Sequence, residues 1–284
     1  MGVIVAGTID AFFFVIGPFL FSIFNSFTNQ NLKTILNPEL KQFVGFDNYR
    51  VLFTGGSLVR SLYNTIWFVI VVVPLQTLFA LGFAVIVNGS ALWKRMLRTC
   101  FFLPVVVSMA VLAVVWSLLY NPEFGAFNAL LEILGLPAQP FLDSPAQAMS
   151  CLIVMSIWQG VGFQMMIFLA GMQAIPKELY EMACIERANC WQQFAYITFP
   201  LLKNTTLFVV FITTIFAFKL FVQPHLITHG GPEHSTQTLI LLLYDEAFVN
   251  GDYGKANAIS VLFFLIVLVI ALLQRRLLPR EERA

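Results

Sequence analysis

The most regular feature of the chain is the alternation of long apolar runs with short polar stretches. Four runs contain uninterrupted cores without Asp, Glu, Lys or Arg, and two weaker runs carry Pro18 and Lys219. Because an α-helix rises about 1.5 Å per residue, each run is long enough to cross a hydrocarbon layer of about 30 Å. The pattern therefore predicts an all-α integral membrane protein with six transmembrane helices, at residues 5–27, 63–88, 99–120, 148–174, 202–224 and 255–275.

Composition agrees with this prediction. Of the 284 residues, 59% are hydrophobic and only 11% are charged, which is typical of a membrane protein. The first run has no basic region before it and no small-residue cleavage site after it, so we expect a retained span rather than a cleaved signal peptide. The polar loops are short to moderate in length, which predicts a single transmembrane domain over residues 1–284.

The basic residues predict the orientation, because Lys and Arg near span ends are retained on the cytoplasmic side. With the N-terminus inside, ten of the 16 Lys and Arg residues lie in inner segments, five lie in outer loops, and Lys219 lies within a span. This bias predicts that both termini are cytoplasmic. It also places the polar segment 176–200 in the cytoplasm.

The chain shows no sequence signal for a metal site or for nucleotide binding. Its four cysteines have no disulfide or zinc spacing. His225, His229 and His234 lie close in the sequence, but their spacing alone does not define a metal site, and we expect none. No glycine-rich loop ends in Lys-Ser or Lys-Thr, so ATP is not expected to bind to this chain.

Segment 176–200 has the pattern of two short amphipathic helices between two spans. Glu178 and Glu181 suit a helix N-terminus after Pro176, and apolar residues recur along one side of that helix. A second short helix is expected after Asn189. An interfacial hairpin that only packs against the membrane surface would have the same general pattern.

In detail, this segment resembles the cytoplasmic coupling loop of permeases of ABC importers. That loop reads Glu-Ala-Ala, three residues, Gly, nine residues, and Ile-x-Leu-Pro. Here the opening is Glu181-Met182-Ala183 and the close is Ile197-Thr198-Phe199-Pro200, with the family's spacing. The resemblance implies that the coupling to an ATPase subunit is made by Glu178, Glu181, Ala183, Glu186 and Arg187.

Arg187 occupies the position of the family's glycine, and Glu186 replaces a common aspartate while keeping its charge. A side chain disfavours positive φ. We therefore expect either that Asn189 makes the turn after the first helix or that this helix runs on.

A second resemblance narrows the group to carbohydrate importers of the maltose and glycerol-phosphate type. It rests on residues 43–49, on residues 218–221, and on the outer loop 226–238 with its Gly-Gly-Pro turn. The resemblance implies a type I ABC-importer permease fold, multi-pass in a bacterial-type cytoplasmic (inner) membrane. The permease is then embedded in the lipid bilayer, and no nucleic acid is expected as a partner.

The same resemblance implies the protein partners. They are a second permease, related but not identical, and two ATP-binding subunits that hold the ATP and magnesium. An external solute-binding protein would face Gly230, Gly231 and Pro232.

By this resemblance, spans four and five line the solute cavity, where amides and hydroxyls would bond solute hydroxyl groups and aromatic faces would contact sugar rings. The corresponding residues are Ser156, Gln159, Gly160, Phe163, Thr213, Phe216, Ala217 and Leu220. Plain helix packing is the alternative role for each of them. Ala217 and Leu220 stand where a maltose permease has amide side chains, so maltose itself is not expected.

Two positions are open for Lys219. In the cavity it would contact an anionic solute such as a glycerol phosphate, whereas near the outer surface it would be solvated. We expect the second, because the family pattern often carries a lysine there.

The implied function is a permease, not an enzyme, in an ATP-driven importer of a sugar, a polyol or a related solute. The alternative is an ATP-independent secondary carrier or channel. That alternative would require acidic or histidine relays within the spans, and the only candidates are Asp10 and Lys219, which both lie near span ends.

Overall fold

A computed structural model describes residue 14 and residues 16–277 of the chain. Within these residues the secondary structure is helical, without β-strands. The elements in chain order are α2 (Gly17–Ser26), α3 (Leu32–Leu36), η2 (Pro38–Leu40), α4 (Asp47–Thr54), α5 (Ser57–Val87), α6 (Leu92–Val106), α7 (Met109–Leu119), α8 (Ala126–Ile133), η3 (Phe141–Asp143), α9 (Ala148–Gln173), α10 (Lys177–Ile185), α11 (Cys190–Gln193), η4 (Phe194–Thr198), α12 (Phe199–Leu201), α13 (Lys203–Phe218), η5 (Pro224–Thr228), α14 (Leu239–Tyr244), η6 (Asp245–Val249) and α15 (Tyr253–Leu277).

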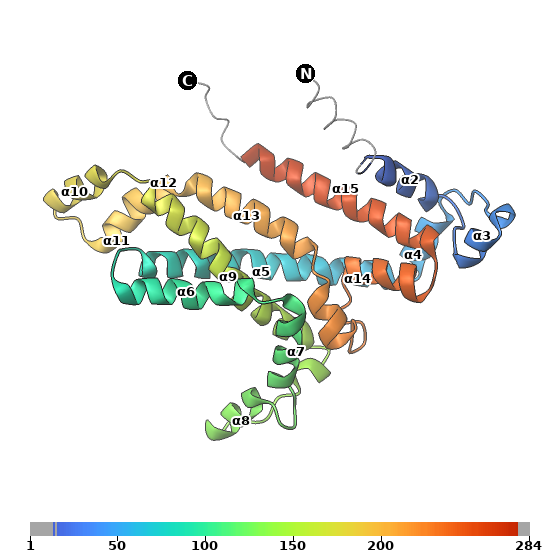
Figure 1. The fold of residues 1–284 in the computed structure, drawn as a ribbon, viewed down its shortest axis with the longest axis horizontal. Helices are drawn as coiled ribbons and strands as arrows, with labels where there is room; N and C mark the ends of the chain where they lie inside the picture. Colours follow the sequence, from blue (N-terminus) through green and yellow to red (C-terminus); the bar gives the residue numbers. More distant parts are fainter. Residues whose placement is uncertain (1–13, 15, 278–284) are drawn as a thin grey trace, which may run out of the picture.

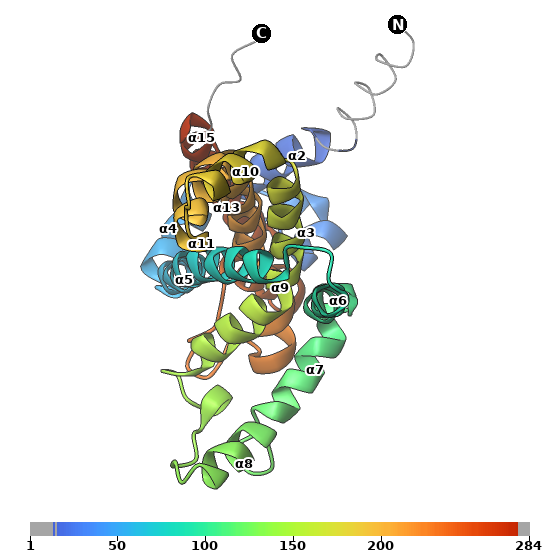
Figure 2. The ribbon, with the colours of Figure 1, turned by 90° about the vertical axis from the view of Figure 1, so that its left-hand side faces the viewer.

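The long helices form one elongated body. Figure 1 shows α5, α13 and α15 running along its length, with the short helices α10 and α11 at one end and α3 and α4 at the other. The chain segment with α7 and α8 projects from the side of this body in both views (Figures 1 and 2). The predicted coupling segment thus lies at the end of the body opposite the first outer loop.

Within residues 14 and 16–277, three helices are long and apolar enough to cross a membrane on their own, namely α5, α9 and α15. They cover the predicted spans at 63–88, 148–174 and 255–275. Two bent pairs, α6 with α7 and α11–α12 with α13, raise this number to as many as five. Ten of the 23 residues of the predicted first span, 5–27, and both chain termini lie outside the described residues, so six spans with cytoplasmic termini stay a prediction.

Residues 99–120 do not form one straight helix. The axes of α6 and α7 meet at 100°. Val107 and Ser108 between them have extended backbones, with ψ of 138° and 131°, which end the hydrogen-bond ladder of α6 before α7 begins. The apolar composition that predicts a span here does not specify the direction of the backbone.

The centre of the body is formed by α9, which packs against α5, α6 and α13. Met165 and Phe168 on α9 are fully buried, and they lie against Ala80 and Ala84 of α5, which are also fully buried. Small residues such as alanine let two membrane helices approach closely, and close packing is what holds helices together in lipid. In contrast, α15 leaves Leu268 and other large apolar side chains exposed, as suits a face toward lipid.

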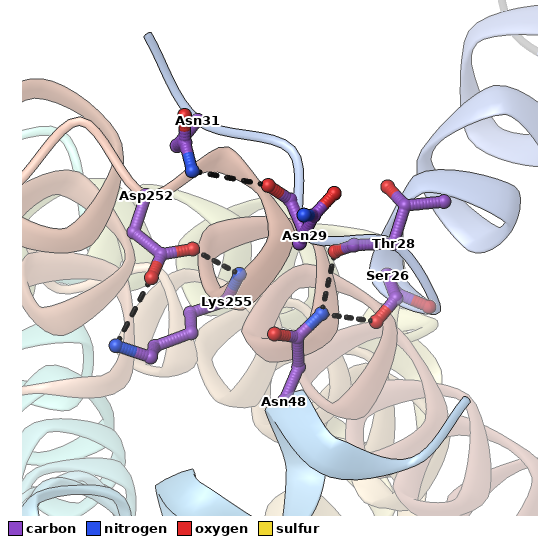
Figure 3. A network of polar contacts seen from close by, with 7 residues as sticks. All are labelled: Ser26, Thr28, Asn29, Asn31, Asn48, Asp252 and Lys255. Atoms are coloured by element: carbon purple, nitrogen blue, oxygen red, sulfur yellow. Dashed lines mark hydrogen bonds and ion pairs between the residues drawn. The ribbon is translucent and has the colours of Figure 1, made fainter. Parts of the chain in front are cut away.

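Polar contacts tie the end of α2 and the residues after it to α4, and an ion pair lies nearby at the start of α15 (Figure 3). The backbone N–H of Gly254 links the two groups by donating to the carbonyl of Gln30 at 2.7 Å. Asn48 Nδ2 donates to the backbone carbonyls of Ser26 and Thr28 at 2.8 and 2.9 Å. Lys255 forms an ion pair of 3.0 Å with Asp252. These contacts hold the polypeptide segments together at the end of the molecule opposite α10.

Candidate functional site

A cavity of about 510 Å³ lies where α5, α9 and α13 meet the residues that follow α13. This volume falls within the range of about 300–1,000 Å³ that is usual for small-molecule sites. All eight residues that the resemblance assigns to the solute site line it: Ser156, Gln159, Gly160, Phe163, Thr213, Phe216, Ala217 and Leu220. Residues about 60 positions apart in the sequence are thereby brought to one place.

The hydroxyl groups of Ser156 and Thr213 are already engaged within the protein. Each donates its proton to the carbonyl oxygen four residues earlier in its own helix, at 2.7 Å in both cases. Each also accepts a hydrogen bond from a glutamine amide: Ser156 from Gln223 at 3.1 Å, and Thr213 from Gln164 at 2.6 Å. Since a hydroxyl has a single proton, neither residue can donate a hydrogen bond to a solute in this arrangement.

Gly160 lines the cavity, but the space beside its Cα atom is occupied by a side chain from α5. A Cβ atom at this position would overlap the Nε2 atom of Gln76 and would lie 2.9 Å from its Cδ atom. Because Gly160 has no side chain, the amide of Gln76 can pack against α9 at this position.

The predicted set omitted the wall that α5 contributes and the amides of Gln164 and Gln223. From α5 come Phe68, Val72 and Gln76. A sequence signal for the three glutamines exists, because an amide inside or beside an apolar run is costly unless it faces protein or water. That signal does not depend on the family pattern, which points only to spans four and five.

The aromatic side chains of the predicted set remain open to contact. Phe216 is 59% exposed and Phe163 is 38% exposed, and both line the cavity. Flat apolar faces of this kind suit the C–H faces of a sugar ring. The cavity thus combines open aromatic faces with several amide groups.

Lys219 lines the cavity and is also exposed, so it combines the two positions that the sequence left open. The reason is that α13 ends at Phe218, where the backbone N–H groups of Lys219 and Leu220 donate to the carbonyls of Phe216 and Ala217 at 3.1 and 3.2 Å and tighten the last turn. Residues 219–223 then leave the helix and all line the cavity. Non-helical backbone at membrane depth is tolerated where it lines such a cavity.

The predicted coupling residues lie on α10 and directly after it. Glu178, Glu181, Glu186 and Arg187 are exposed, and Ala183 is half-buried. The same surface exposes apolar side chains, since Ile185 is 80% exposed and Met182 is 55% exposed. In Figure 1, α10 and α11 form one end of the molecule and are accessible there.

The turn after α10 is made by Arg187, with a φ of 57°. Neither expected alternative, a turn at Asn189 or a continued helix, is right. The backbone N–H of Ala188 donates to the carbonyl of Ala183 at 2.9 Å, and the N–H of Arg187 donates to Cys184 at 3.0 Å. These two bonds satisfy helix-end carbonyls in a Schellman motif, which places Arg187 where glycine is most common.

A second short helix, α11, follows Asn189 as predicted. The Asn189 side chain accepts from the backbone N–H of Gln192 at 2.9 Å, and the Gln192 side chain accepts from the N–H of Asn189 at 2.8 Å. This reciprocal pair is a capping box, which fixes the start of α11. Tyr180 and Thr198 share a hydrogen bond of 2.8 Å that joins α10 to η4.

The Gly-Gly-Pro loop makes a compact turn between η5 and α14. Gly230 has a φ of 83°, and the N–H of Gly231 donates to the carbonyl of Thr228 at 2.8 Å. Asn64 of α5 holds the far side of the loop, because its Nδ2 donates to the carbonyls of His234 and Gln237, both at 2.9 Å. The sequence analysis did not single out Asn64, although it is an amide at the start of an apolar run.

Two histidines of this region, His225 and His229, contact each other with ring centroids 6.1 Å apart. No group of three or more His, Cys, Asp or Glu side chains suited to a metal ion is found in residues 14 and 16–277. His225 also stacks on Phe221, with ring centroids 4.9 Å apart, and contacts Tyr244 at 4.7 Å.

Comparison with known proteins relates this geometry to a family. Residues 76–283 match the family model described as "binding-protein-dependent transport system inner membrane component". The probable ABC transporter permease protein YurN of Bacillus subtilis is 35% identical over 84% of this chain and 83% of that protein. The trehalose/maltose transport system permease protein MalF of Thermococcus litoralis is 36% identical over 81% of this chain and 78% of that protein.

A third relative is the sn-glycerol-3-phosphate transport system permease protein UgpA of Agrobacterium fabrum, 33% identical over 84% of this chain and 82% of that protein. Among solved structures, a bacterial ABC transporter for import of the acidic polysaccharide alginate has a TM-score of 0.85 at 21% identity, covering 99% of this chain and 95% of the other. At this identity the likeness concerns the fold. The chain therefore belongs to the family of inner membrane components of binding-protein-dependent transport systems.

Proposed function

We propose that the cavity carries a sugar, a polyol or a related solute, and that the chain is one of two permeases in an ATP-driven importer. The observation that carries this proposal is the meeting of all eight expected residues, seven on α9 and α13 and Leu220 directly after α13, at one cavity of about 510 Å³. The relatives named for trehalose and maltose and for sn-glycerol 3-phosphate support the solute class. An external binding protein delivers the solute to this cavity.

ATP hydrolysis takes place in separate subunits that bind at α10. The exposed Glu181 and the exposed apolar side chains of Met182 and Ile185 provide a mixed surface suited to a protein groove. The ATP and magnesium belong to those subunits, and this chain contributes no catalytic group. An ATP-independent carrier would not need an exposed surface of this kind on α10, because it binds no ATPase subunit.

A second, related permease covers the open side of the cavity. Phe216 lines the cavity yet is 59% exposed in the single chain, so part of the cavity wall has no cover of its own. A partner helix at this point would enclose the solute between two chains.

The test is to purify the chain from its native membranes in mild detergent and to identify the associated proteins by mass spectrometry. Recovery of a second permease and an ATP-binding subunit, followed by uptake of a sugar by the reconstituted complex only when ATP and binding protein are present, is the expected result. Recovery of the chain alone, with uptake that persists without ATP, would overturn the proposal in favour of a secondary carrier.

A further inference from the structure

Four glutamine side chains surround the cavity, and they come from three separate parts of the chain. Gln76 belongs to α5, Gln159 and Gln164 belong to α9, and Gln223 belongs to the segment after α13. An amide both donates and accepts hydrogen bonds, as a sugar hydroxyl does. Apart from Lys219, the lining residues carry no charged side chain. Amides therefore dominate the polar character of this wall.

Two of these amides are occupied by the protein itself. Gln164 donates to Thr213, and Gln223 donates to Ser156. Gln164 is only 2% exposed, and its Oε1 atom is sealed without a partner in the described residues. These two side chains organise the wall, but they are poorly placed to meet a solute.

Gln76 differs from both. Its amide takes part in no side-chain hydrogen bond found within residues 14 and 16–277, yet the residue is only 8% exposed and lines the cavity. Its amide atoms are not among the sealed atoms without a partner, so they face the open space of the cavity and can form hydrogen bonds there. A solute hydroxyl in the cavity would be such a partner.

The position of this amide is fixed by Gly160. The amide nitrogen occupies the space that a Cβ atom of residue 160 would need. A side chain seated in this way presents its polar atoms in a limited set of directions, which is what selectivity between similar solutes requires.

This inference rests on the proposed function. We infer that Gln76 is a specificity-determining residue of the solute site and that its amide forms hydrogen bonds with hydroxyl groups of a neutral solute. Gly160 acts by leaving the space that the amide of Gln76 occupies. The solute site then has a third wall, on α5, in addition to the expected residues of α9 and α13.

The test uses proteoliposomes that hold the complete complex, with ATP inside and binding protein outside. The probes are radiolabelled maltose, trehalose and sn-glycerol 3-phosphate, and ATP hydrolysis stimulated by the binding protein is measured in parallel. Gln76→Leu should lower uptake of the accepted probe at low concentration by about 2- to 10-fold, the equivalent of one lost hydrogen bond. Stimulated ATP hydrolysis should persist, because it does not require this contact.

Thr77→Val is the matched control. Thr77 is the next residue of α5, is equally buried, does not line the cavity, and has a hydroxyl without a partner in the described part of the chain. Its removal should leave both uptake and ATP hydrolysis unchanged.

Gly160→Ala independently tests whether the space beside Gly160 positions the amide of Gln76. The overlapped atom is the far end of a flexible side chain, so the amide can be displaced without disrupting the helices. We expect this variant to lower uptake alone and to add little in the Gln76→Leu background, because residues that act through one group are not additive.

Three results would overturn the inference: normal uptake by Gln76→Leu, an equal loss of uptake and stimulated ATP hydrolysis in that variant, or full additivity of the two substitutions. If the wild-type complex hydrolyses ATP in response to binding protein but takes up none of the three probes, the proposed solute class falls, and this inference falls with it.

Discussion

The backbone N–H of Ala188 donates to the carbonyl of Ala183 across a turn whose central residue, Arg187, has a φ of 57°. The left-handed conformation costs a residue with a Cβ atom about 1–2 kcal/mol, and the two bonds of the Schellman motif offset this cost. The turn between α10 and α11 is therefore strained at one residue.

Arg187→Gly should relieve this strain. Glycine also raises the conformational entropy of the unfolded chain, which offsets about 0.4–1 kcal/mol of the strain that is relieved. We therefore expect a net stabilisation of the turn of up to about 1 kcal/mol. Hydrogen–deuterium exchange of amides 184–190 should become slower. Glu186→Gly is the control, because Glu186 has a φ of −75° and glycine there adds only freedom. Equal or faster exchange in Arg187→Gly would contradict the argument.

Glu181→Lys should reduce uptake strongly while the chain remains inserted in the membrane. Glu181 is exposed on α10, and reversal of a charge at a complementary surface costs several kcal/mol, so a loss of at least about tenfold is expected. Uptake by proteoliposomes and recovery of the ATPase subunit measure the effect. Glu123→Lys, an equally exposed reversal in the loop after α7, should retain uptake. Normal uptake by Glu181→Lys would remove α10 as the docking site.

Phe163→Ala and Gln159→Ala should each raise the solute concentration needed for half-maximal uptake by about 3- to 10-fold. Loss of an aromatic platform or of one hydrogen bond amounts to about 1 kcal/mol. Val154→Ala provides the comparison, since Val154 lies on the same helix and is 53% exposed but does not line the cavity. An unchanged concentration dependence in both cavity variants would move the solute site elsewhere.

Asn64→Ala should release the outer loop from α5. The substitution removes two hydrogen bonds: the carbonyl of Gln237 loses its side-chain donor, and the carbonyl of His234 keeps only the bond from the N–H of Gln237 at 3.4 Å, at a local cost of about 1–3 kcal/mol. Exchange of amides 235–238 should accelerate, and the affinity for the binding protein should fall.

Asn128→Ala is the matched substitution for this experiment. Asn128 holds the carbonyls of Pro122 and Gln139 in the same manner, at 2.9 Å each, and is also 7% exposed. Its loss should loosen residues 122–139 and leave the outer loop unaffected. Equal effects of both variants on the outer loop would show that Asn64 has no specific role.

Composition predicts the apolar helices, whereas the residues of the cavity were expected only from the resemblance to a known family. Pro104 and Ser108 are local signals for a break between α6 and α7, but they do not specify the 100° angle between the two helices. Arg187 shows the limit of local propensity, because two backbone hydrogen bonds hold it in a conformation that arginine alone disfavours. Gln76 was missed because the family pattern drew attention to spans four and five.

The connection of α10 and α11 to the cavity has a mechanical consequence. The chain enters this segment from α9 and leaves it through α12 into α13, with a bend of 64° before α13. A displacement imposed at α10 therefore reaches both of these walls through covalent backbone, whereas it reaches α5 only through side-chain packing. A protein that binds at α10 would therefore move α9 and α13 together, relative to α5 and its Gln76 side chain.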